Sequence, residues 1–153
     1  MKKRMLAALL LSALLFTLSG CGEKSLLHKK EPVSLTFWHV YGEQAGSPMD
    51  LLVQEFNRTV GQERGVQVKV TGTSSASKIG GYLKEAQSGG KDVQEMPDLF
   101  TCHIIDALEL GEDNLVPWNE QFTPDELSDF IPGFLSDGTA EDGRLLIFPV
   151  SKS

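Results

Sequence analysis

The sequence predicts an α/β fold in which a mostly parallel sheet is flanked by helices, and three observations predict it. Segments with the two-residue period of a strand alternate with segments of helical period. From residue 33 onward their order is strand, helix, strand, helix, strand. Glycine, proline or serine residues separate these segments and mark the ends of the elements. We therefore expect one unit whose neighbouring strands run in the same direction.

The strands are expected from the placement of apolar side chains. Residues 33–37 and 66–70 alternate apolar and polar side chains, so each strand would bury one face. Residues 98–103 are more apolar and are expected to form a third, more buried strand. After a long connection, residues 144–150 again have the pattern of a strand.

The helices are expected between these strands and after them. Apolar residues recur at helical spacing after Ser47, which suits an N-cap, and Gly61 is expected to stop this first helix. A second helix should open near residues 74–77 and end at Gly89. A short helix near residues 104–110 and an acidic helix over 123–130 are expected further on, the latter with the spacing of a capping box.

Residues 1–20 have the features of a secretory signal peptide. A basic start precedes an apolar run over residues 5–18, which is shorter than the ~20 residues of a membrane-spanning helix. The alternative is a membrane anchor that stays attached. Removal of residues 1–20 would take away three of the 14 basic residues and none of the 21 acidic ones, so the net charge would fall from −7 to −10. Such an acidic chain offers no basic surface for nucleic acid or anionic lipid.

Cys21 follows the signal-like segment directly. Residues 18–21 (LSGC) resemble the lipobox of bacterial lipoproteins, in which the cysteine becomes the lipidated N-terminal residue. Several acyl chains on one residue give stable anchoring where a single chain is marginal. A disulfide between Cys21 and Cys102 is the alternative, since exported proteins can hold disulfides. We expect residues 21–32, which carry mixed charges, to be a flexible tether and the folded part to begin near Val33.

Several short motifs follow one another in a characteristic order. They are LTFWH at 35–39, EFN at 55–57, GVQV at 65–68, PDL at 97–99, a stretch at 111–117 that ends in LVP, and DGR at 142–144 before FP at 148–149. Together they resemble the extracellular solute-binding proteins of ABC importers, in the carbohydrate-type group of maltose- and glycerol-3-phosphate-binding proteins. The resemblance implies a periplasmic-binding-protein-like fold of two lobes with the solute between them. Because family members are considerably longer, we expect residues 33–153 to form an incomplete, partial first lobe.

Candidate ligand-binding residues follow the three predicted strands. In open parallel sheets, ligands lie outside the carboxyl ends of the strands. This rule selects Trp38, His39 and Tyr41 after the first strand, Ser74 after the second and His103 after the third. Aromatic faces suit the apolar face of a sugar ring, and hydroxyl and imidazole groups suit its OH groups. The structural alternatives are a core tryptophan, structural or solvent-facing histidines, a helix-capping serine and a loop tyrosine.

The resemblance adds further expected contacts. Family members commonly contact the solute after the second strand, after the third strand and through a serine after the Phe-Pro strand. By matching, these contacts fall near Ser74, near His103 or Ile104, and at Ser153. Glycerol-phosphate binders have an acidic residue about where Ile104 stands, so its absence here favours a saccharide.

An exported hydrolase is the rival class of function. Cys102 and His103 are neighbours on a predicted strand, so their side chains point to opposite faces and cannot form a catalytic dyad. The three histidines lack the spacing of metal ligands, and the acidic residues near 125–129 lack the EF-hand pattern. The sequence contains neither a Gly-x-Ser-x-Gly elbow nor a phosphate loop. We therefore expect no catalytic residues, no metal and no cofactor.

The resulting hypothesis is a solute-binding lipoprotein on the outer face of a bacterial cell membrane. It would capture a sugar or a related small polar solute and deliver it to an ABC permease with its ATPase, and the two lobes would close over the solute. Two alternatives stay open: a glycerol-3-phosphate-type solute, and a truncated, non-binding exported lobe that interacts with another protein.

Overall fold

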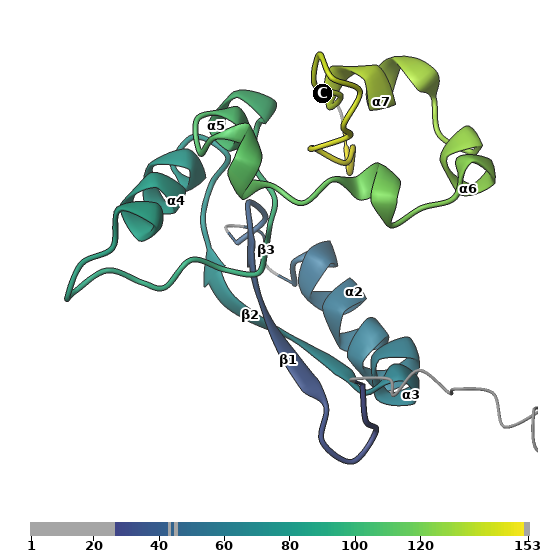
Figure 1. Ribbon diagram of the computed structural model, residues 1–153. Helices are drawn as coiled ribbons and strands as arrows, with labels where there is room; N and C mark the ends of the chain where they lie inside the picture. Colours follow the sequence, from purple (N-terminus) through teal and green to yellow (C-terminus); the bar gives the residue numbers. More distant parts are fainter. Residues whose placement is uncertain (1–26, 43, 45, 152–153) are drawn as a thin grey trace, which may run out of the picture.

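The computed structural model describes residues 27–42, 44 and 46–151, and they contain one parallel three-stranded sheet (Figure 1). Its strands are β1 (Val33–His39), β2 (Val66–Thr73) and β3 (Leu99–Phe100), in the spatial order β2–β1–β3. Both neighbours pair with β1 in parallel, so β1 is the central strand. The predicted α/β class, a mostly parallel sheet flanked by helices, is confirmed.

Helical segments connect the strands and follow the last one. They are α2 (Pro48–Phe56), η1 (Asn57–Gly61), α3 (Gln62–Arg64), α4 (Ile79–Ser88), α5 (Ile104–Leu108), η2 (Glu112–Asn114), η3 (Trp118–Glu120), α6 (Pro124–Ser128) and α7 (Pro132–Asp137). None of the helices in the described part of the chain has the length and apolar character that a bilayer crossing requires. The sequence predicted the positions of α2, α4, α5 and α6, whereas α7 was not anticipated.

Trp38 anchors β1 on the face of the sheet that α4 covers. Its side chain is 4% exposed and packs in a core cluster with Ile79 and Leu83 of α4. A β-bulge makes Thr71 an extra residue in β2, and Nε1 of Trp38 donates to Oγ1 of Thr71 at 3.1 Å. The indole lies so close to Gly72 that a Cβ there would be 2.8 Å from ring atoms. Glycine is therefore required at this position.

His39 anchors the same strand on the opposite face, against α2. Its side chain is fully buried, and Nε2 lies 3.1 Å from Oδ1 of Asp50 in the first turn of α2. The Nδ1 atom accepts the backbone N–H of Tyr41 at 3.1 Å. This acceptor role places the ring proton on Nε2, which then donates to the carboxylate. The buried imidazole thus has a partner on both nitrogens.

The first helical segment continues past the predicted stop at Gly61, so that expectation is wrong. The chain passes through the π-helical η1 and α3 and ends at Gly65, whose φ is +76°. A left-handed backbone of this kind commonly terminates helices and favours glycine. Gly61 instead allows a close approach, because a Cβ there would lie 2.6 Å from the carbonyl oxygen of Val66.

Asn57, at the start of η1, closes the outer edge of β2. Its Nδ2 donates to the carbonyl of Val68 at 2.7 Å, and its Oδ1 accepts the N–H of Val68 at 2.8 Å. The side-chain amide therefore occupies backbone groups that face away from β1. Covered edges of this kind protect a sheet from pairing with another chain.

Two predicted strands differ from the structure. The third strand was expected over residues 98–103, but only Leu99 and Phe100 are in the sheet. The side-chain oxygen of Thr101 accepts the N–H of Val40, and the chain then enters α5. Residues 144–150 form no strand, apart from an isolated bridge between Thr139 and Leu145. Backbone groups there bond to Asn119 and Gly138 instead of a neighbouring strand.

The predicted N-cap of α6 is confirmed, whereas that of α2 differs from the expectation in its hydrogen bonding. Thr123 and Glu126 form the predicted capping box of α6: the N–H of Thr123 donates to the Glu126 carboxylate at 2.8 Å, and Oγ1 of Thr123 accepts the N–H of Glu126 at 3.3 Å. Ser47 occupies the N-cap position of α2, but its hydroxyl is buried without a hydrogen-bond partner. Gly89 ends α4 as expected, with a φ of +64°.

The described end of the predicted tether lies against the folded part. Residues 27–32 make a turn in which the N–H of Glu31 donates to the carbonyl of His28 at 3.1 Å. The backbone of His28 lies over Gly65, where a Cβ would meet it at 2.6 Å. Contacts between this segment and the domain therefore begin before Val33.

Asp98 fixes the start of β3 to β1 through Thr36. The Asp98 carboxylate accepts the backbone N–H and the hydroxyl of Thr36, both at 2.7 Å, and the N–H of Asp98 donates to Oγ1 of Thr36 at 3.0 Å. The backbone N–H of Thr36, followed by its hydroxyl, lowers the pKa of Asp98 below its ordinary value of 3.8. The ionised form is therefore favoured in the folded state.

Replacement of Asp98 by asparagine should flatten the acid dependence of stability. A depressed folded-state pKa adds stability that is present above about pH 4 and is lost as the pH falls through the lowered pKa. We expect the urea midpoint of Asp98→Asn to change less between pH 5 and pH 3 than that of the unsubstituted chain. Asp92→Asn, an exposed carboxylate, is the control. Equal pH profiles for all three proteins would contradict the assignment.

Loss of the Asp50 carboxylate should destabilise the fold through His39. Asp50→Ala leaves a buried imidazole N–H without its acceptor, which costs about 1–3 kcal/mol in the free energy of unfolding. Asp50→Asn keeps an oxygen acceptor and should cost less. Urea unfolding followed by circular dichroism measures both, with Gln54→Ala on the exposed side of α2 as the control. A cost no greater than that of Gln54→Ala would show that the contact does not stabilise the fold.

Candidate functional site

The loops after β2 and β3 meet at the carboxyl end of β1. On one side, the N–H of Ser74 donates to the carbonyl of His39 at 3.0 Å. On the other side, the N–H of Thr101 donates to the carbonyl of Trp38 at 3.0 Å, and Oγ1 of Thr101 accepts the N–H of Val40 at 3.1 Å. The end of β1 therefore positions both neighbouring loops by direct hydrogen bonds.

Tyr41 joins this edge of the sheet to the C-terminal part of the described chain. Its hydroxyl lies 3.1 Å from Oγ of Ser151, so two loops 110 residues apart in sequence meet there. The ring of Tyr41 is half-buried, and its centroid is 6.2 Å from that of His39. The matching of a serine after the Phe-Pro strand chose Ser153, which lies outside the described residues. Ser151 also follows the Phe-Pro segment, and it is the serine whose hydroxyl lies beside that of Tyr41.

Trp38 and His39 are positioned more deeply than the other candidates. Trp38 is in the core cluster, and Nε1 donates to Thr71. His39 has both ring nitrogens engaged, by Asp50 and by the backbone of Tyr41. His39 thus holds the backbone of Tyr41 directly, whereas Trp38 fixes β1 to β2 and α4. Both side chains are buried, so direct contact of either one with a solute stays a prediction and would require the surrounding residues to move.

Ser74 and His103 are the more accessible candidates. Ser74 is half-buried, and its backbone is held against β1. His103 is exposed and is the N-cap residue of α5, where its carbonyl accepts the N–H groups of Asp106 and Ala107 at 3.1 and 3.2 Å. Its imidazole makes no capping bond. The structure therefore places Tyr41 and the Ser74 backbone beside the end of β1, with His103 two residues beyond Thr101.

The surroundings of Cys102 suppress the ionisation of its thiol. Cys102 packs against the core cluster, and burial, followed by the charge of Asp106, raises the pKa of its thiol to about 11. A thiol of this kind is a poor nucleophile at neutral pH. Among residues 27–42, 44 and 46–151, no three His, Cys, Asp or Glu side chains gather in a way that could hold a metal ion.

Two shallow hollows lie on the described surface, and neither is lined by a predicted site residue. One is formed by residues 28–31 before β1, and the other lies along the exposed side of α2 and includes Leu51, Leu52 and Arg58. The candidate site is therefore defined by the converging loop ends and not by either of these hollows.

The fold is similar to that of a solved sugar-binding protein. This protein is the galacto-N-biose-/lacto-N-biose I-binding protein of the ABC transporter from Bifidobacterium longum, in complex with lacto-N-biose. The TM-score is 0.52 at 22% sequence identity, and the match covers 74% of this chain and 27% of that one. No model of a protein family matches the sequence, and none of the curated proteins matches it significantly. The chain thus has part of a periplasmic-binding-protein-like α/β fold and spans about a quarter of the length of its structural neighbour.

Proposed function

We propose that the chain belongs to the substrate-binding component of an ABC importer, which captures a sugar or a related small polar solute outside the cell and delivers it to a membrane permease. The observation that carries this proposal is the meeting of Tyr41 and Ser151 with the loops after β2 and β3 at one end of β1. Ligands of open parallel sheets bind at this end. The likeness to a binding protein solved with lacto-N-biose supports the same class of solute.

The groups at this edge suit a neutral, hydroxyl-rich solute. The ring of Tyr41 offers an aromatic face, and the hydroxyls of Tyr41 and Ser151 each combine a donor with acceptor lone pairs. In this structure the two hydroxyls bond to each other. A solute OH group could bond to both hydroxyls, because each retains hydrogen-bonding capacity beyond the single contact they share. The chemistry proposed is binding alone, with no covalent bond made or broken.

The charge of the three loops favours a sugar over a phosphate-bearing solute. Residues 40–47, 74–78 and 101–103 contain no arginine, and Lys78 is their only lysine. Phosphate sites in proteins typically use arginine forks or several cationic and backbone donors. Asp50, beside the first loop, adds a negative charge. A glycerol-3-phosphate-type solute is therefore the second candidate.

A sugar should perturb the carboxyl edge of the sheet in the full chain. We expect lacto-N-biose or maltose to shift the NMR signals of Tyr41 and Ser74 with a Kd on the order of 1 mM, about 4 kcal/mol of binding free energy, because this edge supplies only a few polar contacts of about 1 kcal/mol each. Tyr41→Ala should weaken binding roughly tenfold through loss of the ring contact, about 1.4 kcal/mol, and Tyr82→Ala on α4 should not.

The outcomes of this titration separate the candidate functions. Shifts with sn-glycerol 3-phosphate and none with either sugar would select the second candidate. A stable, monodisperse chain that responds to none of the three compounds would contradict solute binding by this edge and would favour the exported interaction lobe.

We further propose that residues 1–20 are a signal peptide and that Cys21 carries the lipid that holds the chain on the outer face of the cell membrane. These residues lie outside the described part of the structure. Support comes from the basic start, the short apolar run and the LSGC motif. Residues 21–32 would then connect the lipid to the domain, and their described end packs on Gly65.

Substitution of Cys21 should release the chain from the membrane. In cells grown with radiolabelled palmitate, we expect Cys21→Ala to lose the label and to move from the membrane fraction to the soluble fraction, since the acyl chains supply the anchoring energy. Cys102→Ala is the matched control and should keep both label and location. Unchanged membrane association of Cys21→Ala would indicate that the apolar run itself is retained as the anchor.

A further inference from the structure

Residues 117–148 form a small unit with an apolar centre of its own. The ring of Phe148 contacts Trp118, Phe122 and Phe130, with centroids 5.8, 5.1 and 4.8 Å away. Figure 1 shows this green-to-yellow part of the chain beside the sheet and outside its layers. These three ring contacts lie within the unit and stabilise its interior.

Hydrogen bonds inside the unit hold the segment that leads to Ser151. The N–H of Trp118 donates to the carbonyl of Leu145 at 2.7 Å, and the N–H of Leu145 donates to Oδ1 of Asn119 at 3.0 Å. The N–H of Leu146 donates to the carbonyl of Gly138 at 3.0 Å. Only residues 149 and 150 separate the unit from Ser151, so the placement of the unit limits where Ser151 can lie.

Helix η2 belongs instead to the body that contains the sheet. Leu110, just before η2, is 3% exposed and lies in the core cluster with Trp38. Its carbonyl accepts Nε2 of Gln87 in α4 at 2.7 Å and Nδ2 of Asn114 in η2 at 2.8 Å. Glu112 and Asp113 in η2 are thus fixed to the sheet side of the short connection 115–116.

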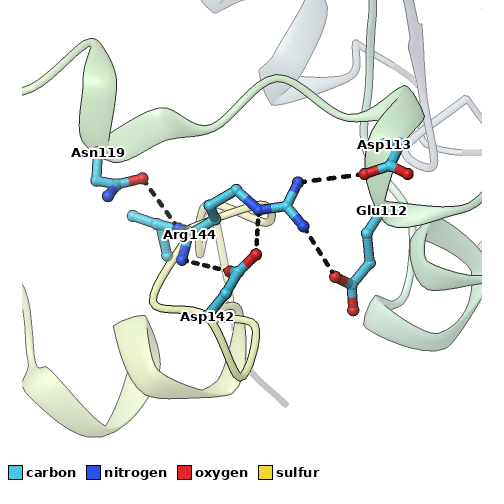
Figure 2. A network of polar contacts seen from close by, with 6 residues as sticks. Glu112, Asp113, Asn119, Asp142 and Arg144 are labelled. Carbon is cyan, nitrogen blue, oxygen red and sulfur yellow. Dashed lines mark hydrogen bonds and ion pairs between the residues drawn. The ribbon is translucent and has the colours of Figure 1, made fainter.

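Arg144 links the two bodies across that connection (Figure 2). From the unit, its guanidinium lies 3.2 Å from Glu112 and 3.8 Å from Asp113. Asp142 belongs to the same hairpin, residues 139–145, and accepts from Nε of Arg144 at 2.6 Å. The hydrogen bond that Arg144 donates to Asp142 raises the pKa of Arg144, and the backbone N–H of Arg144, followed by its side chain, lowers the pKa of Asp142. The side chain is 30% exposed, so the pairs are open to salt.

We propose that Arg144 is a positioning residue: its ion pairs with Glu112 and Asp113 orient the 117–148 unit on the sheet body and thereby bring Ser151 to Tyr41. The importance of this contact for solute binding rests on the proposed function. The contact itself is a property of the chain without any solute, so it is tested separately from sugar binding.

The two tyrosines of the chain, Tyr41 and Tyr82, make a direct test available. Incorporation of 3-fluorotyrosine gives two ¹⁹F NMR signals, which Tyr82→Phe assigns. Ser151→Ala defines the position of the Tyr41 signal without its partner. We expect Arg144→Gln to shift the Tyr41 signal by at least half of the difference between its positions in the unsubstituted chain and in Ser151→Ala. Arg144→Lys should reverse most of this shift, because a cation near Glu112 is restored.

Arg58→Gln is the matched control, because Arg58 pairs with Glu55 at 2.7 Å within the single helical segment of α2 and η1. It should move neither signal. An Arg144→Gln variant whose Tyr41 signal stays at the original position, while Ser151→Ala shifts it, would overturn the proposal. So would a Tyr41 signal that does not respond to Ser151→Ala.

Salt provides a second measurement on the unsubstituted chain in case Arg144→Gln fails to fold, which the Tyr82 signal would report. Raising the ionic strength from about 10 mM to about 1 M shortens the Debye length from roughly 30 Å to 3 Å. The Tyr41 signal should then move toward its position in Ser151→Ala, and salt should have no such effect on Ser151→Ala itself. A Tyr41 signal that does not respond to salt would contradict the ion pairs as the orienting contact.

Discussion

The backbone of β1 between Trp38 and Val40 is the constraint on which the candidate site depends. Its carbonyl groups point alternately to the two neighbouring strands, so one short segment holds the loop after β2 through Ser74 and the loop after β3 through Thr101. The side chains of Trp38 and His39 secure this segment on opposite faces, against α4 and α2. Two of the predicted site residues thus pack and hydrogen-bond inside the fold, and the backbone that they secure positions the loops of Tyr41 and Ser74.

The sequence predicted those features that depend on local period and on local turn chemistry. The strands of the sheet, the capping box at Thr123 and the end of α4 at Gly89 all follow from residues close together in the chain. The strand expected over residues 144–150 was wrong because its backbone groups bond to Asn119 and Gly138, which no local pattern reveals. The rule on strand ends located the candidate loops, but it could not show that His39 is buried against Asp50 or that Ser151 is the serine that meets Tyr41.

The acidic character of the chain has a local structural explanation at three positions. Asp98, Glu126 and Asp142 each accept a backbone N–H, from Thr36, Thr123 and Arg144 respectively. These contacts lower the pKa of all three carboxyl groups. They secure, in turn, the start of β3, the start of α6 and the hairpin that carries Arg144. At each of these positions a carboxylate accepts a backbone N–H in place of a strand or helix carbonyl. Protonation of the carboxylates weakens these contacts, so we expect the folded state to lose stability in acid.

The two kinds of contact around residues 117–148 have different consequences for movement. The aromatic rings around Phe148 are packed within the unit and keep its internal shape. The ion pairs of Arg144 cross to η2, and because partly exposed pairs of this kind contribute little to stability, they can orient the unit without locking it. A solute binder of the proposed kind alternates between states that differ by only a few kcal/mol. A well-packed unit that is attached by weak ion pairs of defined geometry is compatible with such small energy differences. Attachment through a buried aromatic core would make movement of the unit more costly.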